Sequence, residues 1–405
     1  MDHLHKPKLR NISVQRTIYQ NEPVFILQDG LKLTEAAIVL PQALGPVAML
    51  CDGRHTLSDI ERSLESRYGL QVTQSVLENL LEQFDQALLL EGETYDKAKL
   101  AAVETYRSAP HRQPALAGGS YPAQAGALRQ MLKKYVEKAG SVASAAADSR
   151  AIISPHIDYH RGGPVYAKVW TSAAEAVRQA ELVIIIGTDH NGSYGTITLT
   201  PQNYASPLGV LPTATDLVDH LADVIGPERA FSDELHHRGE HSIELDIVWL
   251  QYLREGKPCP VLPILTGSFR HFMLDEADIT EDATIKAFVA ALREIIASRR
   301  TLIVASGDLA HMGPAFDGSP IDTVGYEKMK IDDQALMNNL CLGSAGAFFD
   351  FMKAGQFERN VCGLSPFYFT LSALQQTKGQ TISYDLCPAD HNNRSFVSVC
   401  GLVWQ

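Results

Sequence analysis

Three apolar segments of the chain end in the same way, and this repeated ending constrains the fold more than any other feature. Residues 151–154, 182–186 and 302–305 are rich in β-branched and other apolar side chains, which is typical of buried strands. Each segment is followed by a loop that carries a histidine and an aspartate. Because ligands bind beyond the carboxyl ends of the strands in open α/β sheets, the three endings predict one shared polar crevice.

The segments between and around these endings indicate an α/β fold. We expect further strands at residues 260–266 and 396–404, and helices at residues 124–138 and 279–298. Strands that alternate with helices are typical of α/β domains. The sequence therefore predicts an α/β domain over residues 109–405.

The N-terminal part has a different pattern and predicts a separate small domain over residues 1–108. The expected elements are an extended arm at 1–20, a strand and turn at 24–30, helices at 34–50, 56–69 and 76–84, a β-wing at 88–92 and a polar linking segment with a helical tendency at 95–114. The order of these helices, with Cys51-Asp52-Gly53 between the first two, resembles a PqqD-like winged-helix domain. The resemblance covers about residues 20–95 and implies that this unit binds a partner peptide or protein. The alternative is a small helical cap without a ligand of its own.

Composition excludes several classes of protein. The formal net charge of −12 disfavours binding to nucleic acid or to an anionic membrane, and no apolar stretch approaches the length of a membrane span. The first residues contain no apolar run, so we expect no signal peptide. The six cysteines include no CxxC pair, which argues against a disulfide framework and a thiolate-only zinc site. We therefore expect a cytoplasmic protein with reduced thiols.

Two histidines at equivalent strand ends indicate a metal site. His156 follows a proline, which restricts the backbone just before the imidazole, and His190 follows Gly187, which allows a sharp turn out of the sheet. A single histidine of this kind is more often a structural residue than a ligand. Two of them favour metal binding, because neutral imidazole is the commonest protein ligand for metal ions.

Cys362 is a further candidate ligand. Ser365-Pro366 predicts the N-cap and first residue of a helix that runs to about residue 376. Cys362 would then lie just before a helix N-terminus, where the helix dipole favours a thiolate and therefore metal binding or nucleophilic reactivity. The alternative is a buried, inert cysteine.

Further candidates for catalytic roles in the same crevice are His241, His311 and Asp308. His241 and Glu244 are three residues apart and share one face of an expected helix. His311 and Asp308 follow the strand at 302–305, where His311 is a candidate acid–base group and Asp308 a candidate orienting group. No HExxH, GxSxG or P-loop motif is present, so neither a zincin protease nor a P-loop enzyme is indicated.

Short motifs in this part of the chain resemble the Memo family, and in particular its AmmeMemoRadiSam system protein B group. They occur in family order over about residues 110–405. The motifs are AGGSY (117–121), PHIDY (155–159), IGTDH (186–190), EHSIE (240–244), LPILTG (262–267), SGDLAH (306–311) and CGLSP (362–366).

This resemblance implies a fold and a set of site residues. The family resembles class III extradiol dioxygenases, which implies a central mixed sheet flanked by helices on both faces and a metal-type cleft. It implies His156, His190 and Cys362 as metal ligands, and catalytic roles for His311 and His241 beside the orienting Asp308. The implied ion is iron, copper or zinc. Because Cys362 stands where the dioxygenases have a carboxylate, preference shifts toward softer ions.

These features support more than one hypothesis for the function. The first is a metal-binding protein that acts as a non-heme metal-dependent oxidoreductase on an unknown substrate, with His311 and His241 moving protons. The second is a non-catalytic component that binds a partner or carries metal. The resemblance then implies an AMMECR-type protein and a radical S-adenosylmethionine (SAM) enzyme as partners in a modification system. A metal-assisted hydrolase is the third hypothesis.

Overall fold

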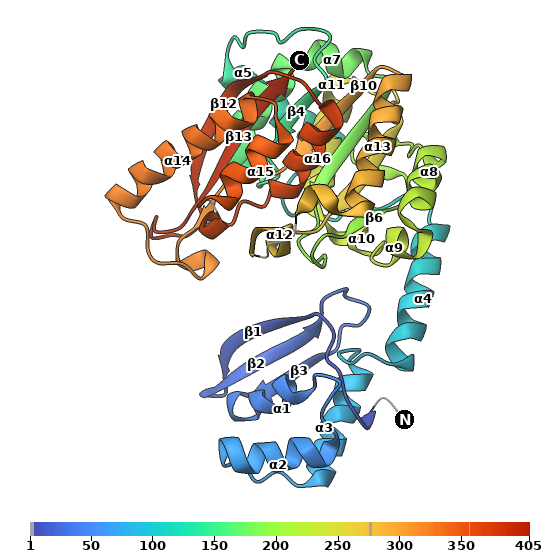
Figure 1. Ribbon diagram of the computed structural model, residues 1–405, viewed down its shortest axis with the longest axis vertical. Helices are drawn as coiled ribbons and strands as arrows, with labels where there is room; N and C mark the ends of the chain where they lie inside the picture. The colour runs from blue at the N-terminus through green and yellow to red at the C-terminus, as the bar shows by residue number, and fades with distance from the viewer. Residues whose placement is uncertain (1–3, 275–277, 356) are drawn as a thin grey trace. The chain divides into compact units, whose positions relative to one another are not determined.

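The computed structural model describes residues 4–274, 278–355 and 357–405. The chain divides into two compact units, residues 1–108 and residues 109–405, which are coloured blue to cyan and cyan to red in Figure 1.

The N-terminal unit combines an antiparallel sheet, in the order β1-β2-β3, with helices. Its strands are β1 (Ile12–Tyr19), β2 (Glu22–Asp29) and β3 (Ala37–Pro41), and its helices are α1 (Gly45–Leu50), α2 (Leu57–Tyr68), α3 (Gln74–Gln86) and α4 (Glu93–Ser108). The turn between β1 and β2 consists of Gln20 and Asn21, whose φ angles of 51° and 64° are those of a hairpin turn that matches the strand twist. Leu27, Leu81 and Phe84 are among the residues of its buried core.

Several predictions for the N-terminal unit were wrong. Within the expected arm at 1–20, of which residues 1–3 lie outside the described residues, Ile12–Tyr19 form β1. This strand was missed because both of its faces are mostly exposed and no apolar alternation marks it. The segment 34–50 is not one helix but β3 followed by α1. In place of the wing at 88–92, Leu90 forms an isolated bridge with Leu9. The helical tendency expected for the segment 95–114 is confirmed, because α4 occupies most of it. The winged-helix assignment stays a prediction.

The C-terminal unit is built on a mixed sheet in the order β11-β13-β4-β10-β5-β9-β6, and β12 pairs with β13. The strands β4, β10, β5 and β9 are parallel to one another, whereas β13 and β6 run antiparallel to their neighbours. A separate hairpin is formed by β7 (Tyr204–Ser206) and β8 (Gly209–Leu211). The strands of the sheet are β4 (Ala151–Ser154), β5 (Leu182–Thr188), β6 (Ile197–Leu199), β9 (Val261–Thr266), β10 (Thr301–Ser306), β11 (His311–Met312), β12 (Gly379–Pro388) and β13 (Phe396–Trp404).

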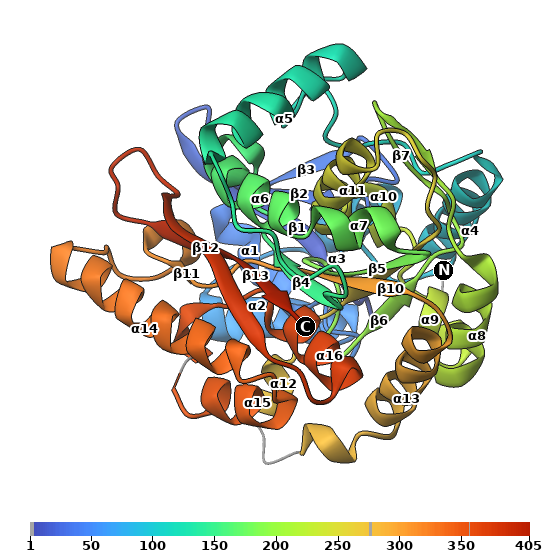
Figure 2. The same cartoon turned by 90° about the horizontal axis from the view of Figure 1, so that it is seen from above.

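Helices cover both faces of this sheet, as Figure 2 shows, with α6, α7 and α11 on one side and α13, α15 and α16 on the other. The prediction of an α/β fold with a mixed sheet between two layers of helices is therefore confirmed. The helices of the unit are α5 (Ala125–Ala139), α6 (Tyr159–Ser172), α7 (Ala174–Gln179), α8 (Thr215–Ile225), α9 (Pro227–Phe231), α10 (His236–Gly239), α11 (His241–Leu253), α12 (Arg270–Leu274), α13 (Ala283–Ser298), α14 (Thr323–Cys341), α15 (Ala345–Lys353) and α16 (Leu364–Leu374). Among the described residues, no helix combines the length and apolar character that crossing a bilayer requires.

The side chains of the central strands point alternately to the two faces of the sheet and so contribute to two hydrophobic cores. Ile153, Ile184 and Ile303 belong to the cluster that includes residues of α13 and α16, whereas Ile152 and Val183 belong to the cluster that includes residues of α6 and α11. Successive side chains of a strand point to opposite faces, so a continuous apolar run is what a sheet covered on both sides requires.

The three apolar segments that share the same polar ending lie side by side as β4, β10 and β5. Ser306 of β10 pairs in register with Ser154 of β4 and with Gly187 of β5. The three strands therefore end at one level, and the loops that follow them leave the same edge of the sheet. The prediction that these segments form one sheet with a common polar edge is confirmed.

Candidate metal centre

The loops after β4 and β10 are tied together at this edge. The backbone amide of His156 donates to Asp308 Oδ1 at 2.9 Å, and His156 Nδ1 lies 3.3 Å from the carbonyl oxygen of Ser306. His156 is 1% exposed. The contact with Ser306 engages Nδ1 and leaves Nε2 of His156 directed at the other site residues.

The start of α11 is held against the end of β5. A Cβ atom on Gly187 would lie 2.5 Å from Ser242 Oγ, so only glycine permits this approach. The Ser242 hydroxyl donates to the carbonyl oxygen of Thr188 at 2.9 Å. This packing brings Glu240 and His241, at the first turn of α11, next to the loop that carries His190.

The start of α16 approaches β10 by a second close contact. A Cβ atom on Gly307 would lie 2.5 Å from the Cα atom of Gly363. The predicted N-cap was wrong, because Gly363 caps α16, while Ser365 is buried inside the helix with its hydroxyl 3.0 Å from Thr266 Oγ1. Cys362 still lies immediately before the helix, as expected, and faces the end of β10.

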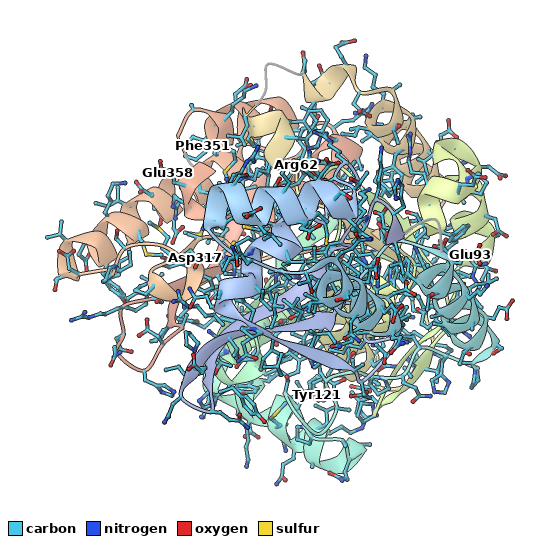
Figure 3. All side chains as sticks on the ribbon, turned by 90° about the horizontal axis from the view of Figure 1, so that it is seen from below. Arg62, Glu93, Tyr121, Asp317, Phe351 and Glu358 are labelled. Atoms are coloured by element: carbon cyan, nitrogen blue, oxygen red, sulfur yellow. The ribbon has the colours of Figure 1, made fainter. Side chains whose placement is uncertain are left out.

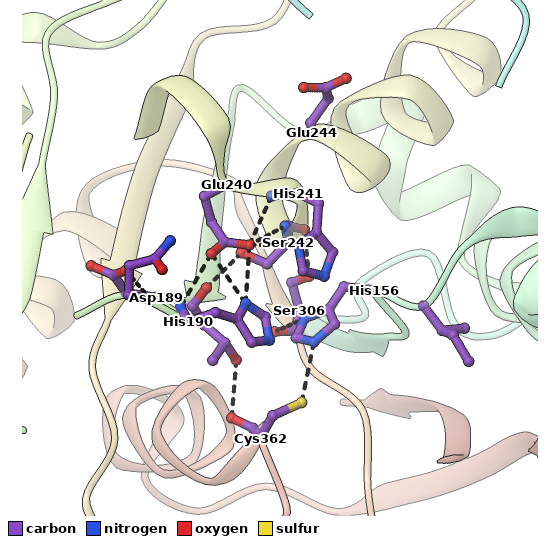
Figure 4. A network of polar contacts seen from close by, with 12 residues as sticks. His156, Asp189, His190, Glu240, His241, Ser242, Glu244, Ser306 and Cys362 are labelled. Carbon is purple, nitrogen blue, oxygen red and sulfur yellow. Dashed lines mark hydrogen bonds and ion pairs between the residues drawn. The ribbon is translucent and has the colours of Figure 1, made fainter. Parts of the chain in front are cut away.

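One carboxylate orients two of the imidazoles. Both carboxylate oxygens of Glu240 lie 3.1 Å from His190 Nδ1, and Glu240 Oε1 lies 2.9 Å from His241 Nδ1 (Figure 4). The same carboxylate accepts the backbone amides of His190, His241 and Ser242. Because both Nδ1 atoms are engaged, the free donor atom of each ring is Nε2, and the two rings stack with centroids 4.7 Å apart.

The thiol of Cys362 lies on the other side of His156. Its Sγ is 3.1 Å from His156 Nε2, and the backbone amide of Asp308 donates to the same sulfur at 3.3 Å. Asp308 Oδ2 lies 3.8 Å from His156 Nε2. His156 is thus the residue shared by all the other candidates.

Within the described residues, two groups of side chains have ligand atoms that all lie within 4.8 Å of one another. The first is His156, His190 and His241, and the second is His156, Asp308 and Cys362. The structure thus divides the three predicted ligands, because His190 and Cys362 stand in different groups. It also brings His241 and Asp308, which were predicted to act beside the metal, to ligand distance.

The aspartates that follow the three strands have separate roles. Asp158 caps α6 and pairs with Arg161 at 2.6 Å, and Asp189 pairs with His236 at 2.8 Å. Of the three, Asp308 is the one that stands in a ligand group of the described residues. The pattern of His with Asp in sequence therefore does not mean that each aspartate faces the site.

The histidines open onto a cleft of about 510 Å³. His311 lies in its wall, with Nδ1 3.1 Å from the carbonyl oxygen of Asn360, and belongs to neither ligand group. Part of its wall is apolar and includes Phe316 and Val397. The cleft is lined by Leu116, Ser120, His156, Ile157, Asp158, Arg161, His190, Gly239, His241, Leu245, Asp308, His311, Ala315, Phe316, Ala389 and Val397.

Burial and charge set different protonation states for the site histidines. Burial, with the neighbouring His190, lowers the pKa of His156 well below its usual value, so this ring is neutral at pH 7. Burial also opposes the charged form of His190, but the hydrogen bond and charge of Glu240 outweigh it and raise the pKa of His190. Although burial works against the charged form of Glu240, hydrogen bonds from His190 and His241 hold the pKa of that carboxyl well below its usual range.

The thiol and the acid–base candidates are shifted mainly by burial. Burial, and then the Asp308 carboxylate, raise the pKa of the Cys362 thiol well above its usual value. Desolvation of the charge therefore opposes the thiolate that the helix dipole favours. Burial likewise raises the pKa of Asp308 and lowers the pKa of His311.

Sequence reasoning assigned no role to Glu240, which the structure places between two imidazoles. A signal was present, because a negatively charged side chain is favoured at the N-terminus of a helix, where it can accept the free backbone amides. A second network was also missed. Glu244, predicted only to share a helix face with His241, is buried and accepts Arg112 Nη1 at 2.5 Å and the hydroxyl of Tyr121, which is labelled in Figure 3. This network holds the segment with the cleft residue Leu116 onto α11.

Fold and site together define an α/β protein with a histidine-rich cleft at the carboxyl ends of parallel strands. A family model described as Memo-like protein matches residues 112–403. The chain belongs to the Memo-like family, as the motifs in its sequence predicted.

Relatives in several microorganisms carry the same family name. The chain is 24% identical to a MEMO1 family protein of Aquifex aeolicus over 98% of this chain and 100% of that protein. It is 26% identical to a MEMO1 family protein of Thermus thermophilus over 83% of this chain and 94% of the relative. A MEMO1 family protein of Archaeoglobus fulgidus is 29% identical over 53% of this chain and 72% of its own length. The match to the Aquifex protein extends over both units of the chain.

Proposed function

We propose that this protein binds one metal ion in the cleft and acts as a non-heme metal-dependent oxidoreductase. The proposed ligands are His156, His190 and Cys362, and the proposed system is that of AmmeMemoRadiSam system protein B. The observation that carries the proposal is the convergence on His156 of a thiol, 3.1 Å from its Nε2, and of two further imidazoles within ligand distance.

The donor set fits a metal ion of the iron, copper or zinc type. Imidazole nitrogen and cysteine sulfur are the ligands these ions prefer, and the Nδ1 atoms of His156, His190 and His241 are all engaged by oxygen atoms. This second layer of contacts is what metal-ligating histidines normally have. A neutral His156 is already in its ligating form, whereas the Cys362 thiol must release its proton when it binds an ion.

A bound ion would supply Lewis acidity, or a redox centre for oxygen chemistry, at the floor of the cleft. The residues of the chain would bind and orient a substrate around it. The apolar wall that includes Phe316 and Val397 excludes water, and His311 can accept a proton because its lowered pKa leaves the ring neutral. The carboxylate of Asp308 accepts the backbone amide of His156 and so holds the loop that carries this histidine.

The second candidate function is that of a component which binds partners or carries metal in a radical SAM-linked modification system. It is favoured by one observation, namely that the relationship with the Aquifex protein covers the N-terminal unit as well as the Memo-like unit. In this case the N-terminal unit would recognise a peptide, or an AMMECR-type protein and a radical SAM enzyme. A metal-assisted hydrolase is the weaker alternative.

Metal analysis of anaerobically purified protein tests the proposal. We expect about one equivalent of iron, copper or zinc in the wild type and almost none in His156→Ala. His220→Ala, at an exposed position of α8, is the matched control and should keep its metal. Wild-type protein without metal, which also takes up none on reconstitution, would refute the metal-dependent function and leave the partner-binding alternative.

A further inference from the structure

A second cavity lies at the opposite end of the sheet from the histidine cleft, on the side covered by α13, α15 and α16 (Figure 2). Its volume is about 860 Å³, and Arg150 and Arg293 are among its lining residues. Arg150 directly precedes β4, whereas His156 follows the carboxyl end of the same strand. The cavity is therefore separate from the candidate metal centre.

Two arginines converge on the last turn of α16 in this cavity. Arg293, from α13, donates through Nε and Nη2 to the carbonyl oxygen of Ser372, at 3.0 and 2.8 Å. Arg150 donates through Nη1 to the carbonyl oxygen of Leu374 at 3.3 Å. A guanidinium has five N–H groups, so each arginine keeps further donors that can bind a ligand.

The sheet fixes the position of Arg150. Its backbone amide donates to the carbonyl oxygen of Trp404 at 2.9 Å, and its own carbonyl oxygen accepts the amide of Ile303 at 3.0 Å. The residue is thus held between β13 and β10 at the start of β4. A side chain that is anchored at its backbone and at one Nη atom loses little further conformational freedom when it binds a ligand.

The lining of this cavity is positively charged, although the formal net charge of the chain is −12. Among the described residues that line it, none is an aspartate or a glutamate. Asp278 lies outside this lining, and its Oδ1 accepts both the backbone amide and the hydroxyl of Thr280. Two guanidinium charges at one turn, without a carboxylate in the lining, favour an anion as the ligand.

The start of α15 adds backbone donors to the same cavity. Ser344 caps this helix, and its Oγ accepts the amide of Ala347 at 3.2 Å. Ala345 and Gly346 also line the cavity, and amides at these first two positions of a helix have no partner within it. A Cβ atom on Gly346 would meet no other part of the protein within 4 Å, so a ligand oxygen has room to approach.

We propose that this cavity binds a small organic phosphate. A phosphate group offers three acceptor oxygens in a tetrahedral arrangement, which suits donors from two guanidinium groups and from a helix N-terminus, whereas a carboxylate offers two oxygens in one plane. The cavity is larger than inorganic phosphate can fill and has the size of a small-molecule site, so the ligand carries an organic part. This site goes beyond the proposed metal-dependent function and does not depend on it.

Isothermal titration calorimetry with glycerol phosphate tests the proposal. The wild type should bind one equivalent. Arg150→Gln and Arg293→Gln should each weaken binding by about 10–100-fold, the range for a lost hydrogen bond to a charged group. Arg299→Gln, at an exposed position just after α13, is the matched control and should bind as the wild type does. Unchanged affinity in both Arg150→Gln and Arg293→Gln would place the anion elsewhere and overturn the proposal.

Two further probes test the chemical class of the ligand. Inorganic phosphate and acetate should each bind the wild type more weakly than glycerol phosphate does. Equal or tighter binding of acetate would overturn the assignment to a phosphate, and equal or tighter binding of inorganic phosphate would overturn the assignment to an organic ligand.

An NMR measurement on the wild type does not depend on the stability of the arginine variants. In protein with isotope-labelled glycine, the amide signal of Gly346 should shift as glycerol phosphate is added, and Gly346→Ala assigns this signal. Gly126 is the control, because it has the same second position in α5, within the same Ala-Gly-Ala sequence, and is exposed.

A shift at Gly126 as large as that at Gly346, or no saturable shift at Gly346, would overturn the proposal. Neither result changes the expected metal content of the protein, so the metal-dependent function stands or fails by its own test.

Discussion

His156 Nε2 lies 3.1 Å from Cys362 Sγ, although 206 positions separate the two residues in the chain. The histidine comes from the loop after β4 and the cysteine from the segment just before the N-cap of α16, and both approach the end of β10. Neither element alone would form a site. The pairing depends on the parallel register of β4 and β10 and on the close approach of Gly307 and Gly363.

Glu240→Gln should weaken metal binding by about 10–100-fold, because the amide cannot accept from both imidazoles and from the backbone amides as the carboxylate does. Equilibrium competition with a chromophoric chelator measures the affinity. The control is Glu228→Gln at an exposed position of α9, which should bind as the wild type does. An unchanged affinity in Glu240→Gln would show that the carboxylate does not orient the ligands.

Glu244→Ala should destabilise the C-terminal unit by about 3–5 kcal/mol, because it leaves the buried charge of Arg112 without its carboxylate. The same change removes the acceptor of the Tyr121 hydroxyl and of two backbone amides near the cleft residue Leu116. Urea unfolding followed by tryptophan fluorescence measures the loss. An effect no larger than that of the exposed Glu228→Ala would contradict this account of the network.

Asp246→Asn should make stability less dependent on pH. Asp246 accepts the Ser154 hydroxyl at 2.5 Å through Oδ1, while Oδ2 has no hydrogen-bond partner in the described structure, and burial raises the pKa of Asp246 to about 8. Between about pH 4 and pH 8 the folded protein therefore holds a proton that the unfolded chain releases, so stability falls as pH rises through this range. The asparagine variant escapes this loss, and its advantage over the wild type should grow to about a few kcal/mol by pH 8.

Urea unfolding at pH 5, 6.5 and 8 measures this difference, with Asp219→Asn at an exposed position of α8 as the control. A difference between Asp246→Asn and the wild type that stays constant across the three pH values would mean that Asp246 is not held in its protonated form.

His311→Ala should keep its metal, because His311 belongs to neither ligand group and its Nδ1 contacts the carbonyl oxygen of Asn360. Any turnover that depends on proton transfer by this ring should fall by about 10²–10⁴-fold. Metal content and oxygen consumption are measured on the same sample. Loss of metal in this variant would place His311 among the ligands.

Strands could be predicted from the sequence where neighbouring residues form a clear apolar pattern. The runs at β4, β5 and β10 are continuous and apolar because helices cover both faces of the sheet, so their boundaries and their common edge could be predicted. The strand β1 could not, since a mostly exposed strand carries no periodic burial signal.

The sequence predicted which residues belong to the candidate site, but not which of their donor atoms face one another. The positions of His156, His190 and Cys362 next to strand and helix ends are local features. Which donors face each other depends on how α11 and α16 pack against the sheet, and that is set by contacts such as Gly187 with Ser242. Such long-range contacts leave no spacing in the sequence that could be read.

Anomalous diffraction from crystals of the metal-loaded protein, recorded at the absorption edge of the bound ion, tests the central claim most directly. We predict one strong anomalous peak for each chain, about 2.0–2.1 Å from a nitrogen of His156. A metal-containing protein whose anomalous peaks all lie away from His156 would contradict the metal centre proposed for this cleft.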